Sequence, residues 1–208
     1  MRPIDQQVIL VTGATSGLGR ALAQRLASLG AQVVVHGRDQ GRLDAACEQI
    51  RDAVPGALLI RRLLPRLQES APARIVQVAS LGQAPFDPAD PQLERRYDGW
   101  QAYLQSKLAQ VMLTRDLAGE LDPAAVTINA LHPATLMDTG MVHEGGIAPR
   151  SSLDEGVRAT LRLLVAPELD GVSGRFFDGT RETEPNPAAD NPQARAFVRA
   201  MTDELLPS

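Results

Sequence analysis

The feature that most constrains this chain is a glycine-rich turn between an apolar segment and a helical one. Residues 8–12 (VILVT) are a short apolar, β-branched run, which predicts a buried strand. The turn 13–19 (GATSGLG) follows, and residues 20–29 then have the pattern of a helix that Gly30 ends. Strand, glycine turn and helix in this order are typical of a dinucleotide site, because glycines let the backbone approach a pyrophosphate and the helix start favours its charge. A tight turn that binds nothing is the alternative, and the context argues against it.

The remaining pattern predicts an α/β fold with a mostly parallel sheet, in which strands and helices alternate. Further strands are expected at 32–35, 74–80, 126–131 and 174–177. Helices are expected at 42–51, 57–69, 101–121, 152–165 and 192–205. Pro55 and Gly56 are expected to end the first of these helices, and a capping box of Ser152 and Glu155 to open the helix at 152–165. The stretches 84–99, 134–150 and 181–191 are expected to be loops, and 134–150 is either a substrate lid or a plain surface loop.

The segment between the second and third expected strands is unusually short. An average strand, helix and their loops take roughly 20 residues together. Residues 37–73 already hold two expected helices. The sequence therefore leaves no room there for a further strand–helix–strand unit.

The end of the second strand bears on the choice of dinucleotide. In such folds the residue after this strand faces the adenosine ribose, where an acid suits the 2′-hydroxyl and an arginine suits a 2′-phosphate. Here Gly37 and Arg38 follow His36, and Asp39 is interpreted as a helix N-cap. The sequence predicts NADP as cofactor, with NAD as the alternative.

Three polar residues are candidates for chemistry. Lys107 is the only lysine of the chain and lies four residues after Tyr103, so both share one face of the helix expected at 101–121. Such a pair can equally be an ordinary surface contact on a helix. Ser80 ends a strand, at the edge where ligands bind in open parallel sheets.

Composition excludes several classes of function. A net charge of −4 gives no electrostatic footprint for nucleic acid, and no apolar run is long enough to span a membrane. The single cysteine, Cys47, excludes an intrachain disulfide, and no signal peptide is expected, so we expect a cytoplasmic protein of one domain, residues 1–208. His132 and His143 lack metal-ligand spacing, so no metal site is predicted.

Together and in this order, the motifs resemble those of the short-chain dehydrogenase/reductase family. They are the T-G-x-x-x-G-x-G turn at 12–19, Ser80, the pair Tyr103-x-x-x-Lys107, and His132-Pro133-Ala134 after a later strand. The spacer between Ser80 and Tyr103, the run 102–109 and the ending 171–179 resemble the retinol-dehydrogenase-like branch of the family. The resemblance covers nearly the whole chain.

The resemblance implies a Rossmann-like, doubly wound sheet and an oxidoreductase that transfers a hydride between NADP(H) and a small or hydrophobic alcohol or carbonyl. Tyr103 would be the acid/base, Lys107 would lower its pKa from about 10 and bind the cofactor ribose, and Ser80 would orient the substrate oxygen. Family members often pair through their two long helices, as a homodimer or homotetramer, and the oligomeric state here is left open. The implied cofactor-binding residues are Gly13, Thr15, Ser16, Gly17, Leu18, Gly19, Arg38, Tyr103, Lys107, Pro133, Ala134, Thr135 and Thr139.

The departures from the family pattern are as informative. The family's third and fourth strands, its Asn-Asn-Ala-Gly motif and the asparagine of its catalytic tetrad have no counterpart, so we expect a shortened sheet with a deletion between Ala53 and Leu59. Ala134 stands where the family usually has glycine, and Thr139 lies one place later than the usual threonine. An alternative function is therefore a catalytically inactive relative that binds nucleotide or acts as a protein-interaction module.

Overall fold

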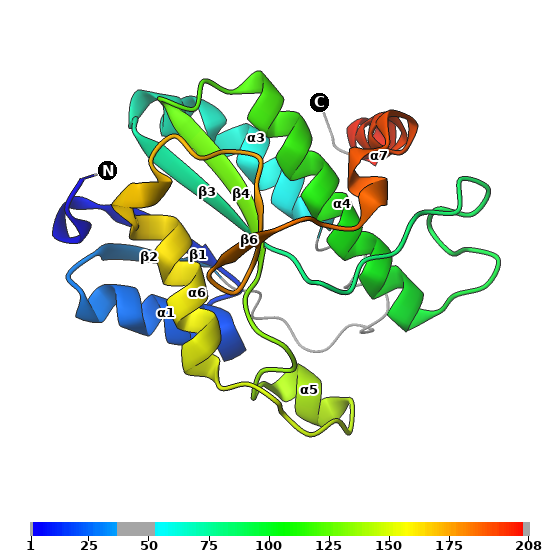
Figure 1. Cartoon of the computed structure of the whole chain (residues 1–208), viewed down its shortest axis with the longest axis horizontal. Helices are drawn as coiled ribbons and strands as arrows, with labels where there is room; N and C mark the ends of the chain where they lie inside the picture. Colours follow the sequence, from blue (N-terminus) through cyan, green and yellow to red (C-terminus); the bar gives the residue numbers. More distant parts are fainter. Residues whose placement is uncertain (1, 37–52, 206–208) are drawn as a thin grey trace.

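A parallel β-sheet that is split into two pieces forms the centre of the protein (Figure 1). The computed structural model describes residues 2–36 and 53–205. The first piece pairs two parallel strands, β1 (Val8–Thr12) and β2 (Gln32–His36). The second has four strands in the order β3 (Ala73–Val78), β4 (Val126–His132), β5 (Phe176–Asp178) and β6 (Arg181–Thr183). All pairs are parallel except β5 with β6, so the expected mostly parallel α/β fold is confirmed.

The helices surround these two pieces. They are α1 (Gly17–Ser28), α3 (Ala53–Glu69), α4 (Gly99–Glu120), α5 (Gly140–Glu144), α6 (Leu153–Val165) and α7 (Pro192–Leu205). Short 3₁₀ turns lie at Ile4–Gln6, Pro167–Leu169 and Pro187–Asp190. The helix expected at 42–51 lies outside the described residues. The loops expected at 134–150 and 181–191 contain α5 and β6, two short elements that the sequence pattern missed.

Helix α3 differs from the expectation at its start. It begins at Ala53 and runs through Pro55 and Gly56, which we had interpreted as a helix end. A proline is tolerated in the first turn of a helix, because the N–H that it lacks there would have no intrahelical partner. Pro65 also lies within α3, which continues to Glu69.

The starts of α4 and α6 follow local capping rules, whereas those of α1 and α5 have no side-chain cap hydrogen bond. The Asp98 carboxylate accepts a hydrogen bond from Gln101 N at 2.8 Å and opens α4. The Ser152 hydroxyl accepts from Glu155 N at 3.3 Å, which confirms the expected cap of α6. Ser16, at the start of α1, makes no side-chain cap hydrogen bond.

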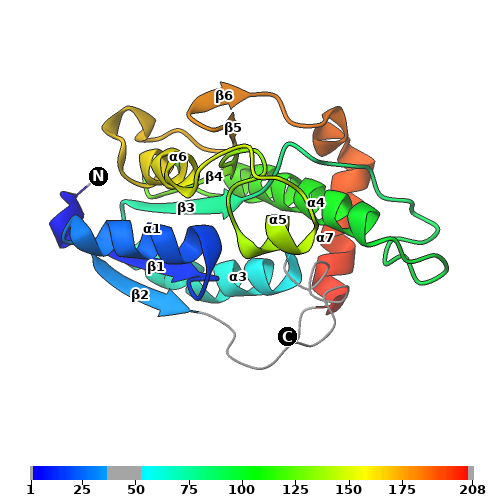
Figure 2. The ribbon, with the colours of Figure 1, turned by 90° about the horizontal axis from the view of Figure 1, so that it is seen from below.

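Helices cover both faces of the larger sheet piece, as in a doubly wound fold. α1 and α6 lie side by side (Figures 1 and 2), and α6 packs on both sheet pieces, through Val157 beside α1 and through Leu163 beside β4 and β5. α3, α4 and α7 pack on the opposite face of the larger piece, where Ile128 and Met112 are fully buried. All seven residues of β4 are buried, so this strand is the centre of the core.

Among the described residues, helices pack against β1 and β2 on one face only. No strand is described between β2 and β3, and β1 does not pair with β3 within the described residues. Val8 and Leu10 of β1 and Val34 and Val35 of β2 are exposed, Val8 by 66%. No helix in the described ranges is long and apolar enough to cross a membrane.

Candidate active site

The glycine turn between β1 and α1 has a backbone geometry that requires glycine. Gly13 has φ +63° and Gly17 has φ +48°, backbone conformations that residues with a Cβ rarely adopt. A Cβ on Gly19 would lie 2.4 Å from the Gly13 carbonyl oxygen, so only glycine fits there. Gly13, Thr15 and Ser16 are exposed along the turn.

The start of α1 presents its backbone N–H groups at this turn. Because Ser16 does not cap the helix, its first N–H groups are left for another acceptor. Ala14 N donates to His36 O at 3.0 Å, which ties the turn to the end of β2. The turn is thus held on the sheet beside the uncapped start of α1, an arrangement that suits a phosphate.

The loop after β4 meets the glycine turn from the other sheet piece. A Cβ on Gly17 would lie 3.4 Å from Thr139 Cγ2. A Cβ on Gly156 of α6 would meet Leu18 and Pro133, at 3.1 and 3.6 Å. The predicted cofactor residues on both sides are therefore neighbours in space, although the two sheet pieces are not paired.

Ser80 and Tyr103 are brought together at Gly82. A Cβ on Gly82 would lie 3.5 Å from Ser80 Oγ and 3.9 Å from Tyr103 Cε1. It would also lie 2.9 Å from Leu104 Cδ2, so the turn after β3 sits directly against α4. Gly82 N donates to Ser80 Oγ at 3.1 Å, which leaves the hydroxyl proton of Ser80 for a further acceptor.

Lys107 lies one helical turn after Tyr103. Its Nζ is 5.5 Å from the centroid of the Tyr103 ring. It donates to Val78 O and to Gln110 Oε1, both at 3.3 Å. The ammonium is thereby held at the carboxyl end of β3, beside the tyrosine.

Trp100 belongs to the same surface, and the sequence interpretation missed it. Its ring stacks on Tyr103 with centroids 5.5 Å apart and planes 15° apart, and the residue is 66% exposed. Its position three residues before Tyr103 on a helix was a signal that could have identified it. Tyr103 therefore has an aromatic neighbour on one side along α4 and a cation on the other.

His132 is a buried structural residue at the end of β4. Its Nε2 lies 3.0 Å from Thr135 Oγ1, so Thr135 is engaged within its own loop. Burial lowers the pKa of His132 below its ordinary value, while the Asp178 carboxylate raises it by a smaller amount. The neutral form of the ring is thus favoured.

The other predicted residues are less constrained. Ala134 is half-buried beside Pro133, and Thr139 precedes α5. Arg38 lies outside the described residues. His143 is exposed and pairs with Asp138 at 2.6 Å, and no cluster of three metal-ligating side chains occurs in the part of the chain that the structure describes.

Comparison with known proteins decides the family. The model of the "short chain dehydrogenase" family matches residues 7–61 and 54–147, which together are more than half of the chain. The chain belongs to the short-chain dehydrogenase family. The enzyme class expected from the sequence, an NAD(P)-dependent short-chain dehydrogenase/reductase, is thereby confirmed at the level of the family.

Similar proteins agree with this assignment and with the predicted branch. Retinol dehydrogenase 12 of Homo sapiens is 27% identical, over 96% of this chain and 86% of the relative. An uncharacterized protein from Mycobacterium paratuberculosis has a similar crystal structure (TM-score 0.71, 22% identity, 96% of this chain and 93% of that chain). So does a short chain dehydrogenase from Shigella flexneri complexed with NADP (TM-score 0.62, 20% identity, 85% and 98%).

The same comparisons support the internal deletion. The alignment with retinol dehydrogenase 12 has 274 positions, at least 66 more than the 208 residues of this chain. The two matches to the family overlap at residues 54–61, so this segment resembles two separate parts of the family. The overlap coincides with the junction that the sequence predicts between Ala53 and Leu59.

Proposed function

We propose that this protein is an NADP(H)-dependent oxidoreductase that moves a hydride between the nicotinamide and a small or hydrophobic alcohol or carbonyl. The observation that carries the proposal is the meeting of Ser80 and Tyr103 at Gly82, with the Lys107 ammonium 5.5 Å from the tyrosine ring. A hydroxyl donor, an acid/base and a cation at one strand end are the groups that such a reaction needs.

The residues present fit a dinucleotide. The glycine turn has no room for a Cβ at Gly19, and α1 begins without a side-chain cap, so backbone N–H groups are available to a pyrophosphate. Lys107 would hold the ribose, and the loop of Pro133, Ala134, Thr135 and Thr139 would hold the nicotinamide. The bound cofactor would supply or accept the hydride. Arg38 favours the 2′-phosphate of NADP over NAD, and the related Shigella flexneri structure contains NADP.

The protein's own residues would handle the proton. In reduction, Ser80 Oγ donates a hydrogen bond to the substrate carbonyl oxygen, and the Tyr103 hydroxyl gives that oxygen its proton as the carbon accepts the hydride. Lys107 stabilises the negative charge left on the tyrosine oxygen. In oxidation the same groups act in reverse, with Tyr103 as the base.

The test is NADPH consumption with a panel of aliphatic and aromatic aldehydes and ketones. The variant Tyr103→Phe keeps the ring and its stacking on Trp100 but lacks the hydroxyl. We expect kcat/KM to fall about 10²–10⁴-fold, while NADPH binding measured by calorimetry is retained. Equal rates for the two proteins would show that Tyr103 is not the acid/base.

A second candidate function is a catalytically inactive relative that binds nucleotide or another protein. The exposed apolar residues of β1 and β2 favour it, because a surface of this kind suits a protein partner. The calorimetric titration and the turnover assay together distinguish the two. Micromolar NADPH binding together with turnover supports the oxidoreductase, whereas a folded chain that binds NADPH without turnover supports the alternative.

A further inference from the structure

The loop that carries Ser80 into the site has little structure of its own. Residues 79–98 connect β3 to α4 and contain no helix or strand. The position of the Ser80 hydroxyl therefore depends on contacts from outside the loop. β4 and α4 supply two of them: Ala79 N donates to Leu131 O, and Ala84 N donates to Leu104 O. Others come from the C-terminal end of the chain.

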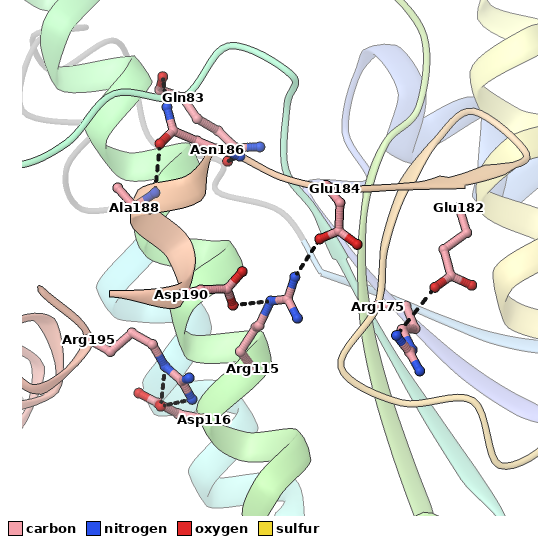
Figure 3. A network of polar contacts seen from close by, with 10 residues as sticks. All are labelled: Gln83, Arg115, Asp116, Arg175, Glu182, Glu184, Asn186, Ala188, Asp190 and Arg195. Atoms are coloured by element: carbon pink, nitrogen blue, oxygen red, sulfur yellow. Dashed lines mark hydrogen bonds and ion pairs between the residues drawn. The ribbon is translucent and has the colours of Figure 1, made fainter. Parts of the chain in front are cut away.

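Gln83 is the residue through which these contacts reach Ser80. Its Nε2 donates to the Ser80 carbonyl oxygen at 2.7 Å. Its Oε1 accepts from Asn186 N at 3.0 Å, and its own carbonyl oxygen accepts from Asn186 Nδ2 at 3.2 Å. One side chain thus joins the Ser80 turn to a residue 103 positions away (Figure 3).

Asn186 is itself held in place. Its Oδ1 accepts from Ala188 N at 2.9 Å and begins the 3₁₀ turn Pro187–Asp190. Arg115 of α4 pairs with Asp190 of this turn at 3.1 Å, whereas its contact with the exposed Glu184 is longer, at 3.4 Å (Figure 3).

The helix after this turn strengthens the same connection. Arg195 of α7 binds the buried carboxylate of Asp116, also on α4. Phe197 packs against Phe86 of the Ser80 loop, with ring centroids 6.4 Å apart. The C-terminal segment, residues 184–198, therefore contacts both the helix that carries Tyr103 and the loop that carries Ser80.

We propose that Gln83 is a positioning residue, which with Asn186 holds the Ser80 hydroxyl in register with Tyr103. This inference rests on the proposed function, because its effect on kcat can be measured only if the protein turns over a substrate. The C-terminal segment thereby acts on catalysis without touching the substrate. A small displacement of Ser80 would weaken its hydrogen bond to the substrate oxygen and leave the dinucleotide turn unaffected.

The main test uses Gln83→Met, which keeps the length of the side chain and removes its donor and acceptor. We expect kcat to fall about five- to tenfold, the change expected when the single hydrogen bond from Ser80 to the substrate oxygen is lost, with KM for NADPH unchanged. The matched control is Glu184→Gln in the same segment, whose 88% exposed side chain makes only a long ion pair. We expect its kcat to equal that of the unmodified protein.

A double-mutant cycle separates positioning from general stability. In a Ser80→Ala background, Gln83→Met should cause no further loss of kcat, because Gln83 acts through Ser80. A loss of the same size in both backgrounds would overturn the inference. If Gln83→Met fails to fold, Asn186→Asp replaces it, since the aspartate keeps the acceptor for Ala188 N and loses the donor to Gln83 O. A loss of kcat of the same size with and without Ser80→Ala would then overturn the inference.

Amide hydrogen exchange gives a readout that does not need turnover. Gly82 N–H is bonded to Ser80 Oγ, so we expect it to exchange faster in Gln83→Met and at an unchanged rate in Glu184→Gln. Unchanged exchange of Gly82 in Gln83→Met would contradict the inference. Faster exchange in a protein without turnover on any carbonyl would overturn the proposed function and still support the contact between Gln83 and Ser80.

Discussion

Two regions of the protein are built from similar segments and are buried very differently. The N-terminal unit, residues 8–36, and the C-terminal unit, residues 73–205, each contain parallel apolar strands. Every residue of β4 is buried, whereas Val11 is the only buried residue of β1 and β2. The difference shows that burial depends on neighbours. Within the described residues, β4 has a strand on each side and helices on both faces, whereas β1 has one partner strand and one covered face.

A second contrast concerns the helix that follows each strand. α4 begins with a side-chain cap from Asp98, and α1 begins with none. The C-terminal unit thus satisfies its helix start within the chain. The first N–H groups of α1 receive no side-chain cap, which is consistent with the cofactor proposal.

The largest expected effect compares two valines that each begin a strand. Val126 of β4 is 1% exposed and Val8 of β1 is 66% exposed. Val126→Ala should lower the free energy of unfolding by about 2–3 kcal/mol, and Val8→Ala by less than about 0.5 kcal/mol. Urea unfolding of both variants measures the difference. Equal losses would mean that the exposed face of β1 is covered in solution, for example by another protein.

The second prediction compares two glycines in helices. Gly19→Ala would place a Cβ 2.4 Å from a backbone oxygen of the turn, and should cost about 1–3 kcal/mol and abolish NADPH binding. Gly119 of α4 has free space around its Cβ position, so Gly119→Ala should stabilise the protein by about 0.4–1 kcal/mol and leave binding unchanged. Thermal unfolding and calorimetric titration test both. Retained NADPH binding in Gly19→Ala would refute the role of the glycine turn.

The third prediction concerns the two helix starts. Asp98→Ala removes the hydrogen bond to Gln101 N and should lower the free energy of unfolding by about 1 kcal/mol. Ser16→Ala should leave it unchanged, because the Ser16 side chain makes no cap hydrogen bond. Denaturant titrations without cofactor measure both. A similar loss in Ser16→Ala would show that α1 is capped in solution.

The smallest expected effect is a pH dependence in the C-terminal unit. Because burial lowers the pKa of His132, the unfolded chain binds its proton more readily, and stability should fall as the pH drops below the ordinary histidine value of about 6.5. The loss continues down to the lowered pKa of the folded state. His132→Gln should have a smaller slope of stability against pH in this range than His143→Gln, whose replaced histidine is exposed. Identical slopes would exclude His132 as the source.

The sequence predicted those features of the protein that depend on residues close together in the chain. The glycine turn, the Tyr103–Lys107 pair and the capping of α6 follow from spacings of a few residues, and these local rules hold wherever the segment lies. Chain length was informative too, because a strand and a helix need a minimum number of residues. It predicted that the strands between β2 and β3 are missing, and the comparisons support that deletion.

Other features could be seen only in the folded chain. The end of a helix at Pro55 was predicted wrongly, because proline is tolerated in a first turn and the sequence alone does not say where that turn begins. The contact of Trp100 with Tyr103 was missed. Many aromatic residues near a helix start are exposed to solvent, so the sequence did not single out Trp100.

The sequence by itself determined the family, the candidate catalytic residues and the shortening of the sheet. Only the tertiary structure decided that the sheet is split, that one face of β1 is exposed, and that Gln83 joins Ser80 to Asn186. These features depend on contacts between residues far apart in the chain, and a local pattern carries no information about which distant surface it will meet. The β-branched runs of β1 and β4 look alike for this reason, and their neighbours make one a core strand and the other a surface strand.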